Sequence, residues 1–508
     1  MPGQRVIVVG AGVGGLVAAL ELAHQGLEVL VLEAADQPGG KMRQVRIGDA
    51  LLDAGPTVFT MRSVFDALFA QVGEQLHGHL ALKPVQTLAR HAWGHGRPLD
   101  LHADVAQSAD AIGDFAGAGE AARYLAFCKR ARLIYQTLEQ PFIHGSRPNA
   151  VSLAARVGRR GLAGLTRISP FGSMWKALGR YFHDPRLQQL FGRYATYCGS
   201  SPFMAPATLM LVAHVEQDGV WLLEGGMHRL ATTLEDLAMR RGAAFRYGAP
   251  VREVLTQGGR ACGVRLAGGE TIAASAVIFN GDAGALSAGL LGARAARAVG
   301  ATARSARSLS AITWNVVTPA RGFPLLRHNV FFSGNCQAEF SELFDHGRLP
   351  SEPTVYVCAQ DRSDTDAAGP RGSERLLCLV NAPATGDDKD SDGTDPAALA
   401  RCEDAAFRRL EACGLRLYRD SGQTLRTTPQ DFNRLFPATG GALYGQASHG
   451  WMASFRRPGA RSRLDGLYLA GGGTHPGPGV PMAALSGRQA AASVLADIGA
   501  AMHRGRAA

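Results

Sequence analysis

One stretch near the amino terminus decides the fold, and it reads Val6-Ile-Val-Val-Gly10-Ala-Gly12-Val-Gly14-Gly15. Its apolar start predicts a short buried strand, and Gly10 allows the sharp turn that follows the strand. Gly12 lets the backbone approach a pyrophosphate, and Gly15 lets the next helix pack closely against the strand. Free N–H groups at the start of that helix would point at the phosphates. We therefore predict that Gly10, Gly12, Gly14 and Gly15 bind a dinucleotide.

A carboxylate marks the end of the second apolar run. Residues 27–32 predict another buried strand, and Glu33 follows it about twenty residues after the glycine turn. An acid at this position accepts hydrogen bonds from ribose hydroxyls and disfavours a 2′-phosphate, so NADP is not expected. The alternative is a strand–turn–helix unit without a ligand, which the joint register of strands, turn and acid disfavours.

A second glycine-rich segment lies near the other end of the chain. Residues 466–488 read Gly-Leu-Tyr-Leu-Ala-Gly-Gly-Gly-Thr-His-Pro-Gly-Pro-Gly-Val-Pro-Met-Ala-Ala-Leu-Ser-Gly-Arg, which predicts a strand, a turn and a helix. The first fingerprint alone does not separate NAD from FAD. A second strand-to-helix turn this far along the chain indicates a long cofactor held at both ends, and it favours FAD.

Two short segments beyond Glu33 are predicted to line the channel between pyrophosphate and flavin. The first, Pro38-Gly-Gly-Lys-Met-Arg43, supplies Gly40, Lys41 and Arg43, and the second, Asp53-Ala-Gly-Pro-Thr57, supplies Gly55, Pro56 and Thr57. Arg43 could offer phosphate a forked pair of donors. The alternative interpretation makes both segments ordinary loops with surface charges.

Composition limits the class of protein. The chain has 508 residues, of which 46% are apolar, so it is long enough for more than one globular domain. Its eight cysteines are scattered without a C-x-x-C pair, so we predict neither a metal site nor a disulfide framework, as in a cytosolic enzyme. The net charge is +10. No nucleic-acid module is visible, so a membrane surface is the better partner for this charge.

Motifs along the whole chain are similar to those of the FAD-dependent carotenoid desaturases, within the wider flavin amine oxidase and phytoene desaturase superfamily. They are Gly39–Lys41, Asp53–Thr57, Phe191-Gly-Arg-Tyr-Ala-Thr-Tyr197, Gly219–His228, Asn280-Gly-Asp282, His328–Ser333, Leu443-Tyr-Gly445 and Gly471–Gly479. Within this family, residues 89–93, 353–362, 433–437 and 450–457 resemble the bacterial 1-hydroxycarotenoid 3,4-desaturases, also called methoxyneurosporene dehydrogenases.

The resemblance implies further cofactor contacts. A helix amino terminus at Val480, Pro481 and Met482 would face the flavin, with Gly472 and Gly473 in the preceding turn, and the backbone of Val251 would contact adenine. Met482 departs from the smaller residue of many relatives and could reshape the pocket beside the flavin. No catalytic residue can be named, because His475, Glu224, His228 and His449 are each expected to be structural.

The resemblance also implies an activity. It is FAD-dependent desaturation of a carotenoid in photosynthetic bacteria, which introduces the 3,4 double bond into 1-hydroxy- or methoxy-neurosporene-type substrates by hydride transfer to flavin. A phytoene-type desaturase acting in several steps is the first alternative, and a flavin amine oxidase is a more distant one. A non-catalytic lipid escort on the same fold is an alternative of another class, which the intact turn at residues 471–482 disfavours. The electron acceptor stays open.

We expect an α/β protein in which a Rossmann-type FAD-binding domain is joined to an α+β substrate domain and a helical membrane-facing lobe. The FAD-binding domain would be discontinuous, built from residues 1–80, 215–295 and 440–508. Residues 81–214 would give helices of the substrate domain and residues 296–439 mostly its sheet. The composition of residues 363–397, rich in Asp, Gly, Ser, Thr and Pro, predicts a solvated loop.

The membrane-facing lobe is expected at residues 152–182. This segment combines apolar residues near helical spacing with six basic residues, as an interfacial helix does. The alternative is a pair of core-facing helices with a solvated basic face. No run long enough to cross a bilayer is seen. We therefore expect a cytoplasmic protein that is peripherally associated with the inner membrane, where its carotenoid substrate is dissolved.

Overall fold

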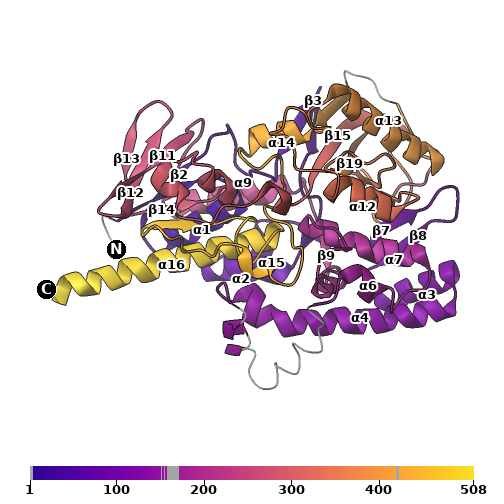
Figure 1. Cartoon of the computed structure of the whole chain (residues 1–508), viewed down its shortest axis with the longest axis horizontal. Helices are drawn as coiled ribbons and strands as arrows, with labels where there is room; N and C mark the ends of the chain where they lie inside the picture. The colour runs from indigo at the N-terminus through magenta and orange to yellow at the C-terminus, as the bar shows by residue number, and fades with distance from the viewer. Residues whose placement is uncertain (1–3, 150, 154, 157–170, 419–422, 508) are drawn as a thin grey trace.

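Five parallel strands form the first sheet of the computed structural model, which describes residues 4–507 except 150, 154, 157–170 and 419–422 (Figure 1). Strand β1 pairs with β2 on one side and β14 on the other, so the strand order reverses beside β1. That reversal is typical of a dinucleotide-binding sheet. The order across the sheet is β10 (Ala244–Arg246), β2 (Glu28–Leu32), β1 (Arg5–Val9), β14 (Ala276–Phe279) and β22 (Leu467–Leu469).

Alternate side chains of β1 enter two different cores, because successive residues of a strand point to opposite faces. Val6 and Val8 pack on the helical face, whereas Ile7 and Val9 pack on the other. The helical face is covered by α1 (Val13–His24), α2 (Arg62–Gln71), α9 (His228–Arg240) and α16 (Val480–Ala507). The other face is covered by β11 (Val251–Gln257), β12 (Arg260–Leu266), β13 (Thr271–Ala273), α10 (Ala283–Ser287) and α11 (Ala293–Ala296).

A mixed sheet of seven strands forms the second unit. Its order is β21 (Thr424–Thr427), β15 (Ser310–Thr318), β19 (Glu374–Ala382), β18 (Val355–Ala359), β17 (His328–Phe331), β7 (Thr87–Ala92) and β8 (Leu99–His102). In β15, Ile312, Trp314 and Val316 pack into the apolar core beneath helix α13 (Pro396–Ala412). Asn315, between them, points the other way and donates to the carbonyl of Asp53 in the first unit, at 3.2 Å. The polar face of this sheet therefore meets the cofactor unit.

Helices cluster below the second sheet in Figure 1, around the long helix α4. They are α3 (Val105–Ala116), α4 (Ala118–Leu138), the π turn Glu139–His144, α6 (Met174–Leu178), α7 (Pro185–Gly192), the 3-10 turns Arg193–Cys198 and Ala207–Met210, and α8 (Leu211–Gln217). Their shared core is aromatic, with Phe127, Phe182 and Phe191 in mutual contact.

Small sheets and turns connect these parts. Strands β5 (Phe59–Thr60) and β6 (Leu82–Pro84) both pair with β9 (Val220–Leu223), which ties three distant segments together. The remaining elements are β3 (Gln44–Ile47), β4 (Ala50–Asp53), β16 (Ala320–Arg321), β20 (Arg416–Leu417), α12 (Cys336–Phe344), α14 (Pro429–Leu435), α15 (Ala453–Arg456) and the 3-10 turns Leu76–Gly78 and Arg304–Ala306.

Two expectations about the second unit were wrong. The predicted loop at 363–397 contains β19, which lies between β15 and β18 and pairs with both. The mainly helical segment 81–214 also supplies β7 and β8 to the same sheet. All five strands of the first sheet lie within the segments assigned to the cofactor domain, while the domain boundaries themselves stay a prediction.

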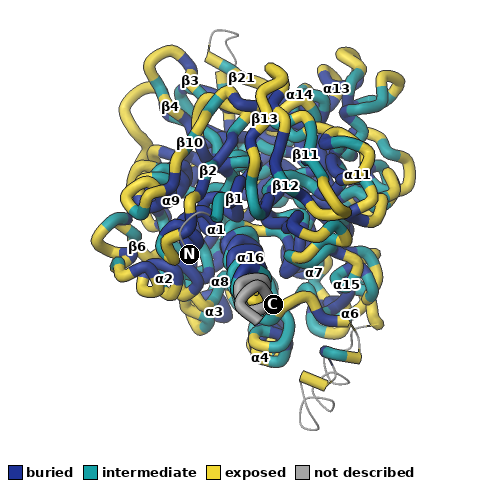
Figure 2. The backbone as a smooth tube through the Cα atoms, turned by 90° about the vertical axis from the view of Figure 1, so that its left-hand side faces the viewer, coloured by how far each residue is buried: buried dark blue, intermediate teal, exposed yellow. Residues whose placement is uncertain are grey.

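Helix α16 projects from the body of the protein toward the carboxyl terminus, as Figure 1 shows. Its first half is buried against α1, and Figure 2 looks along the helix toward this buried part. Across the part of the chain that the structure describes, no helix is both long and apolar enough to pass through a bilayer. Residues 154 and 157–170 of the predicted membrane-contact segment 152–182 lie outside the described residues.

Candidate FAD site

The reversal of strand order places the two turns that follow β1 and β14 next to each other. Gly10 leaves β1 with φ 102°, a backbone conformation that favours glycine. Asn280 leaves β14, and its side-chain amide donates to the Gly10 carbonyl at 3.1 Å. In open α/β sheets, ligands bind beyond the carboxyl ends of the strands at this point.

The fingerprint glycines are also required for packing. A Cβ on Gly15 would lie 2.2 Å from the Gly10 carbonyl oxygen, and one on Gly12 would lie 2.9 Å from the Asn280 side-chain nitrogen. A Cβ on Gly14 would lie 2.7 Å from the backbone nitrogen of Gly471. The amino-terminal and carboxyl-terminal glycine segments are therefore in direct contact, as the expectation of one shared ligand requires.

Helix α1 begins at this edge with its N–H groups uncapped by any side chain and with no acid in its first turn. Glu33 lies beside that start, where one carboxylate oxygen accepts from the Ala11 amide at 2.6 Å and the other from the Ala35 amide at 2.9 Å. The carbonyl of Glu33 accepts from the Ala249 amide, which brings the segment leading into Val251 alongside it. The start of α1, Glu33 and the segment before Val251 therefore lie side by side, as successive contacts with phosphate, ribose and adenine would require.

The first channel segment crosses the start of α1. Gly39 donates to the carbonyl of Ala11, and a Cβ on Gly40 would lie 3.3 Å from the Cα of Gly12. The Lys41 ammonium donates to the Leu443 carbonyl at 2.6 Å, and burial lowers its pKa. The guanidinium of Arg43 points elsewhere.

Arg43 donates to the Thr427 hydroxyl at 3.1 Å and lies over the ring of Phe432. Both partners belong to the second unit, so Arg43 links the two units here. Its expected contact with phosphate stays a prediction, and no observed contact supports it.

The second channel segment reaches the sheet of the second unit. A Cβ on Gly55 would lie 2.0 Å from the Lys41 carbonyl oxygen, so the two channel segments are packed against each other. After Pro56, the hydroxyl of Thr57 lies 2.7 Å from that of Tyr356 on β18. Tyr356 in turn lies 2.7 Å from Nδ1 of His328 on β17. This buried polar chain fixes the channel segment relative to the second sheet.

The carboxyl-terminal turn is held by groups to which the sequence had given no role. Gly471 donates to the Ser486 hydroxyl at 2.6 Å, and a Cβ on Gly473 would lie 3.1 Å from the Asp282 carboxylate. The buried guanidinium of Arg457 donates to the carbonyls of Tyr444 and Gly472.

Helix α16 then begins at Val480, with Pro481 and Met482 in its first turn and no acid there. Its start therefore repeats the acid-free start of α1. Asn280 and Asp282 could have been found as polar residues directly after a buried strand, whereas Arg457 carries no such signal.

The side chains considered as bases make structural bonds. His475 Nε2 lies 2.9 Å from the Gly145 carbonyl oxygen, and burial lowers the pKa of His475 to about 4. His228 Nε2 lies 2.9 Å from the Pro38 carbonyl oxygen. His449 accepts from the Ser201 amide at 3.0 Å, and burial lowers its pKa to about 4.

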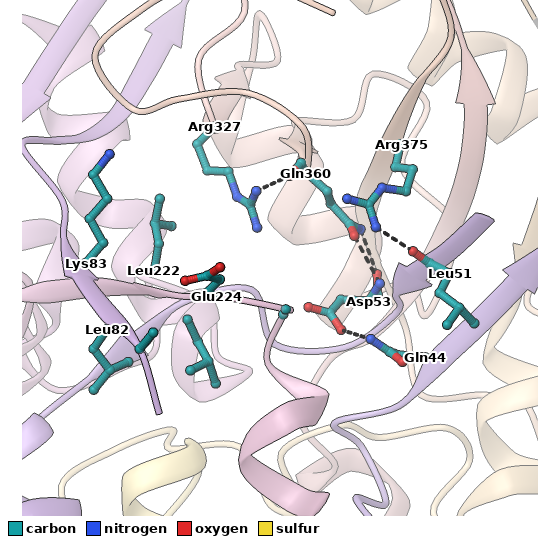
Figure 3. A pocket seen from close by; sticks show the side chains of 14 residues that line it. Gln44, Leu51, Asp53, Leu82, Lys83, Leu222, Glu224, Arg327, Gln360 and Arg375 are labelled. Carbon is teal, nitrogen blue, oxygen red and sulfur yellow. Dashed lines mark hydrogen bonds between the residues drawn. The ribbon is translucent and has the colours of Figure 1, made fainter. Parts of the chain in front are cut away.

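Glu224 lines a cavity of about 470 Å³ between the two units (Figure 3). The figure shows its carboxylate directed into a space that Lys83 and Arg327 also border. Arg375 and Asp53 form the far wall. These charged walls do not suit a hydrocarbon chain, because an apolar ligand cannot satisfy buried charges.

The donor set at the sheet edge fits FAD. The start of α1 offers N–H groups to phosphate, and the Glu33 carboxylate can accept from ribose. The first turn of α16 adds N–H groups with no carboxylate nearby in sequence, which suits negative charge on a reduced ring.

Comparison with known proteins agrees with this geometry. The family described as flavin containing amine oxidoreductase matches residues 13–495. A hydroxyneurosporene desaturase of Rubrivivax gelatinosus is 56% identical over 97% of this chain and 94% of its own length. A second, from Cereibacter sphaeroides, is 45% identical over 97% of this chain and 98% of its own length.

A solved oxidoreductase from Methanosarcina mazei shares the fold with a TM-score of 0.59, at 16% identity, covering 96% of this chain and 99% of that one. The likeness to this structure concerns the fold alone. The chain therefore belongs to the flavin containing amine oxidoreductase family and, within it, is an FAD-dependent oxidoreductase of the group that includes the hydroxyneurosporene desaturases.

Proposed function

We propose that this protein is a carotenoid desaturase that introduces the 3,4 double bond into 1-hydroxy- or methoxy-neurosporene-type substrates. The observation that carries the proposal is the 56% identity to a hydroxyneurosporene desaturase across nearly the whole of both chains. The contact between the two glycine segments supports a redox role, because a lipid escort would have no need of it.

When bound, FAD supplies an acceptor for a hydride from an allylic carbon of the polyene. The protein holds the cofactor through the starts of α1 and α16 and through Glu33. It aligns the substrate by packing the polar face of the second sheet against the cofactor unit, as the bonds from Asn315 and Tyr356 illustrate. Such positioning can supply much of the rate enhancement.

Membrane contact is part of this proposal. Phe171, which directly follows residues 157–170, is 77% exposed, and its ring contacts the exposed Trp451. Val151, six residues before them, is 80% exposed. Exposed aromatic and aliphatic side chains of this kind are typical of proteins that dip into a bilayer surface. We therefore place the protein at the cytoplasmic face of the inner membrane, with this edge toward the lipid.

The test supplies the purified flavoprotein, in lipid vesicles, with phytoene, neurosporene and 1-hydroxyneurosporene separately. We expect the absorption spectrum of 1-hydroxyneurosporene to shift to longer wavelength as one double bond is added. Conversion of phytoene alone would contradict the proposed substrate and favour the phytoene-type alternative. A matched preparation of Gly15→Val, which cannot pack α1 against the Gly10 turn, should contain no flavin and convert nothing.

A further inference from the structure

Helix α4 turns one long face to solvent, and the proposed function has so far given this face no role. Its exposed residues recur at spacings of three and four, so they lie along one side of the helix. Between residues 122 and 133 they are either apolar or basic, and they are Ala122, Leu125, Ala126, Lys129, Arg132 and Leu133. Leu125 and Leu133 are 40% and 39% exposed. This outer face of α4 is about 17 Å long between residues 122 and 133.

No acidic residue interrupts the outer face of α4. Within Ala118–Leu138, all of which the structure describes, the only acid is Glu120, which is buried and accepts from Arg123 at 3.3 Å. The opposite side of the helix packs Tyr124 and Phe127 into the aromatic core. The outer face therefore presents leucines and basic side chains together, as a helix at a bilayer interface does.

Helix α13 shows what a solvated helix of the same protein looks like. Its outer face carries Arg401, Asp404, Arg408 and Glu411, so both signs of charge are mixed along it. Within Pro396–Ala412, no large apolar side chain is exposed. The outer face of α4 differs in both respects, and solvation by water alone does not account for it.

The outer face of α4 lies at one edge of the molecule. Helix α4 runs along the lower edge in Figure 1 and lies at the lower edge again in Figure 2, whereas α13 lies near the upper edge in both views. Residues 151–153 and 155–156, drawn as two short pieces beside the grey trace, also lie at the lower edge. The neighbouring helix α3 exposes Asp110 and Asp114, so the acid-free surface ends there.

The carboxyl end of α4 leads directly to the cofactor segments. The helix continues into the π turn Glu139–His144, in which the ring of Phe142 lies 4.9 Å from that of His475. The carbonyl of Gly145 then accepts from Gln489 on α16 at 3.0 Å and lies 2.9 Å from His475 Nε2. A surface that binds α4 is therefore held at a fixed position relative to the carboxyl-terminal turn.

Charge decides which surface suits α4. Lysine and arginine side chains extend their charged ends to lipid phosphates while their aliphatic parts stay among apolar groups. Lys129 lies one turn from both Leu125 and Leu133, so the leucines can enter the acyl region while the cations reach the phosphates. A second copy of this chain fits less well, because a symmetric contact sets the same cations against one another.

We propose that the outer face of α4 is the surface by which this protein lies on an anionic bilayer. Leu125 and Leu133 enter the outer part of the acyl layer, and Lys129 and Arg132 bind lipid phosphate groups. The inference rests on the proposed function, because a substrate dissolved in the membrane gives this contact its purpose. It adds a fully described helix to the contact expected at residues 152–182.

The test measures binding of the flavoprotein to vesicles of phosphatidylcholine, with and without phosphatidylglycerol, by flotation. Each basic residue near anionic lipid strengthens binding about fivefold. The double variant Lys129→Gln and Arg132→Gln should therefore bind the anionic vesicles about 25-fold more weakly, with little change on the neutral ones. The double variant Leu125→Gln and Leu133→Gln should bind both kinds of vesicle about tenfold more weakly, because it removes exposed apolar surface.

The matched control is the double variant Arg401→Gln and Arg408→Gln, which removes the same charge from the outer face of α13 near the opposite edge. It should bind vesicles like the unmodified protein. Equal weakening in this control would mean that net charge alone drives binding, and it would overturn the proposal. Unchanged binding of the Lys129 and Arg132 variant, or no binding of the unmodified protein to anionic vesicles, would overturn it as well.

Two further measurements separate the remaining explanations. If the unmodified protein is a dimer that the leucine variant separates while vesicle binding is retained, the outer face belongs to a second copy and the proposal is overturned. Flavin content and thermal unfolding show that each variant is folded, and the cation and leucine variants test the surface independently. Failure of the proposed function is a different result, in which the unmodified protein does not convert 1-hydroxyneurosporene in detergent micelles, where no bilayer is needed.

Discussion

Substituting Gly487 by alanine should weaken FAD binding, although Gly487 itself is not expected to contact the cofactor. Gly487 lies on α16 where this helix crosses α1, and an added Cβ would lie 2.2 Å from the carbonyl oxygen of Gly14. Both atoms belong to rigid backbone, so the two helices would have to separate by about 1 Å to restore an ordinary contact. The starts of both helices are expected to hold the same cofactor.

The magnitude follows from the cost of overpacking. Inserting a methyl group into a well-packed contact costs about 1–3 kcal/mol. The apoprotein can relax by parting the helices, whereas the FAD complex needs both helix starts in place. If the cost falls on the complex, the dissociation constant of FAD rises about 5- to 150-fold.

The assay is fluorescence titration of deflavinated protein with FAD. Gly499→Ala is the matched control, because it lies on the same helix with nothing within 4 Å of an added Cβ. It should bind FAD like the unmodified protein and gain about 0.5–1 kcal/mol of helix stability. If Gly487→Ala bound FAD as tightly as this control, the argument that the α1–α16 contact positions the cofactor would be refuted.

Three further predictions concern affinity, pH and stability. Glu33→Gln should weaken FAD binding about 10-fold or more, because it removes a charge-assisted hydrogen-bond acceptor, while the circular dichroism spectrum stays unchanged. An unaltered affinity would mean that Glu33 does not bind the cofactor. Burial lowers the pKa of His475 from 6.5 to about 4, so protonation favours the unfolded chain. The free energy of unfolding should therefore fall by about 3 kcal/mol as pH falls from 6.5 to 4, and it should not change through this group above pH 6.5. In His475→Gln, the free energy measured by urea unfolding should depend less steeply on pH. Glu374→Gln leaves the buried Arg362 without its paired charge and should cost about 3–5 kcal/mol in urea unfolding, whereas Glu28→Gln in an exposed pair should cost under about 1 kcal/mol.

The cofactor unit could be predicted from local sequence patterns. An apolar strand, a glycine turn and a helix are set by residues close in sequence, so the span from Val6 to Glu33 could be interpreted without knowing its neighbours. The same applies to the start of α16, where Pro481 suits a first helical turn. The amino-acid sequence thus determined the fold class, the cofactor and the family resemblance.

The second sheet was predicted less well. The nine residues of β19 lie between two stretches rich in Asp, Gly and Ser, and the average composition of the whole window hid them. Strand β7 was missed because its partner β17 lies more than two hundred residues away, and β8 joins the sheet through β7. Pairing over such distances leaves no local periodicity from which it could be inferred.

Tertiary structure alone decided which side chains act together. The bond from Asn280 to Gly10 and the contact of Gly14 with Gly471 join segments hundreds of residues apart. Residue spacing determines local conformation, but the distance between remote side chains is set only when the whole core closes.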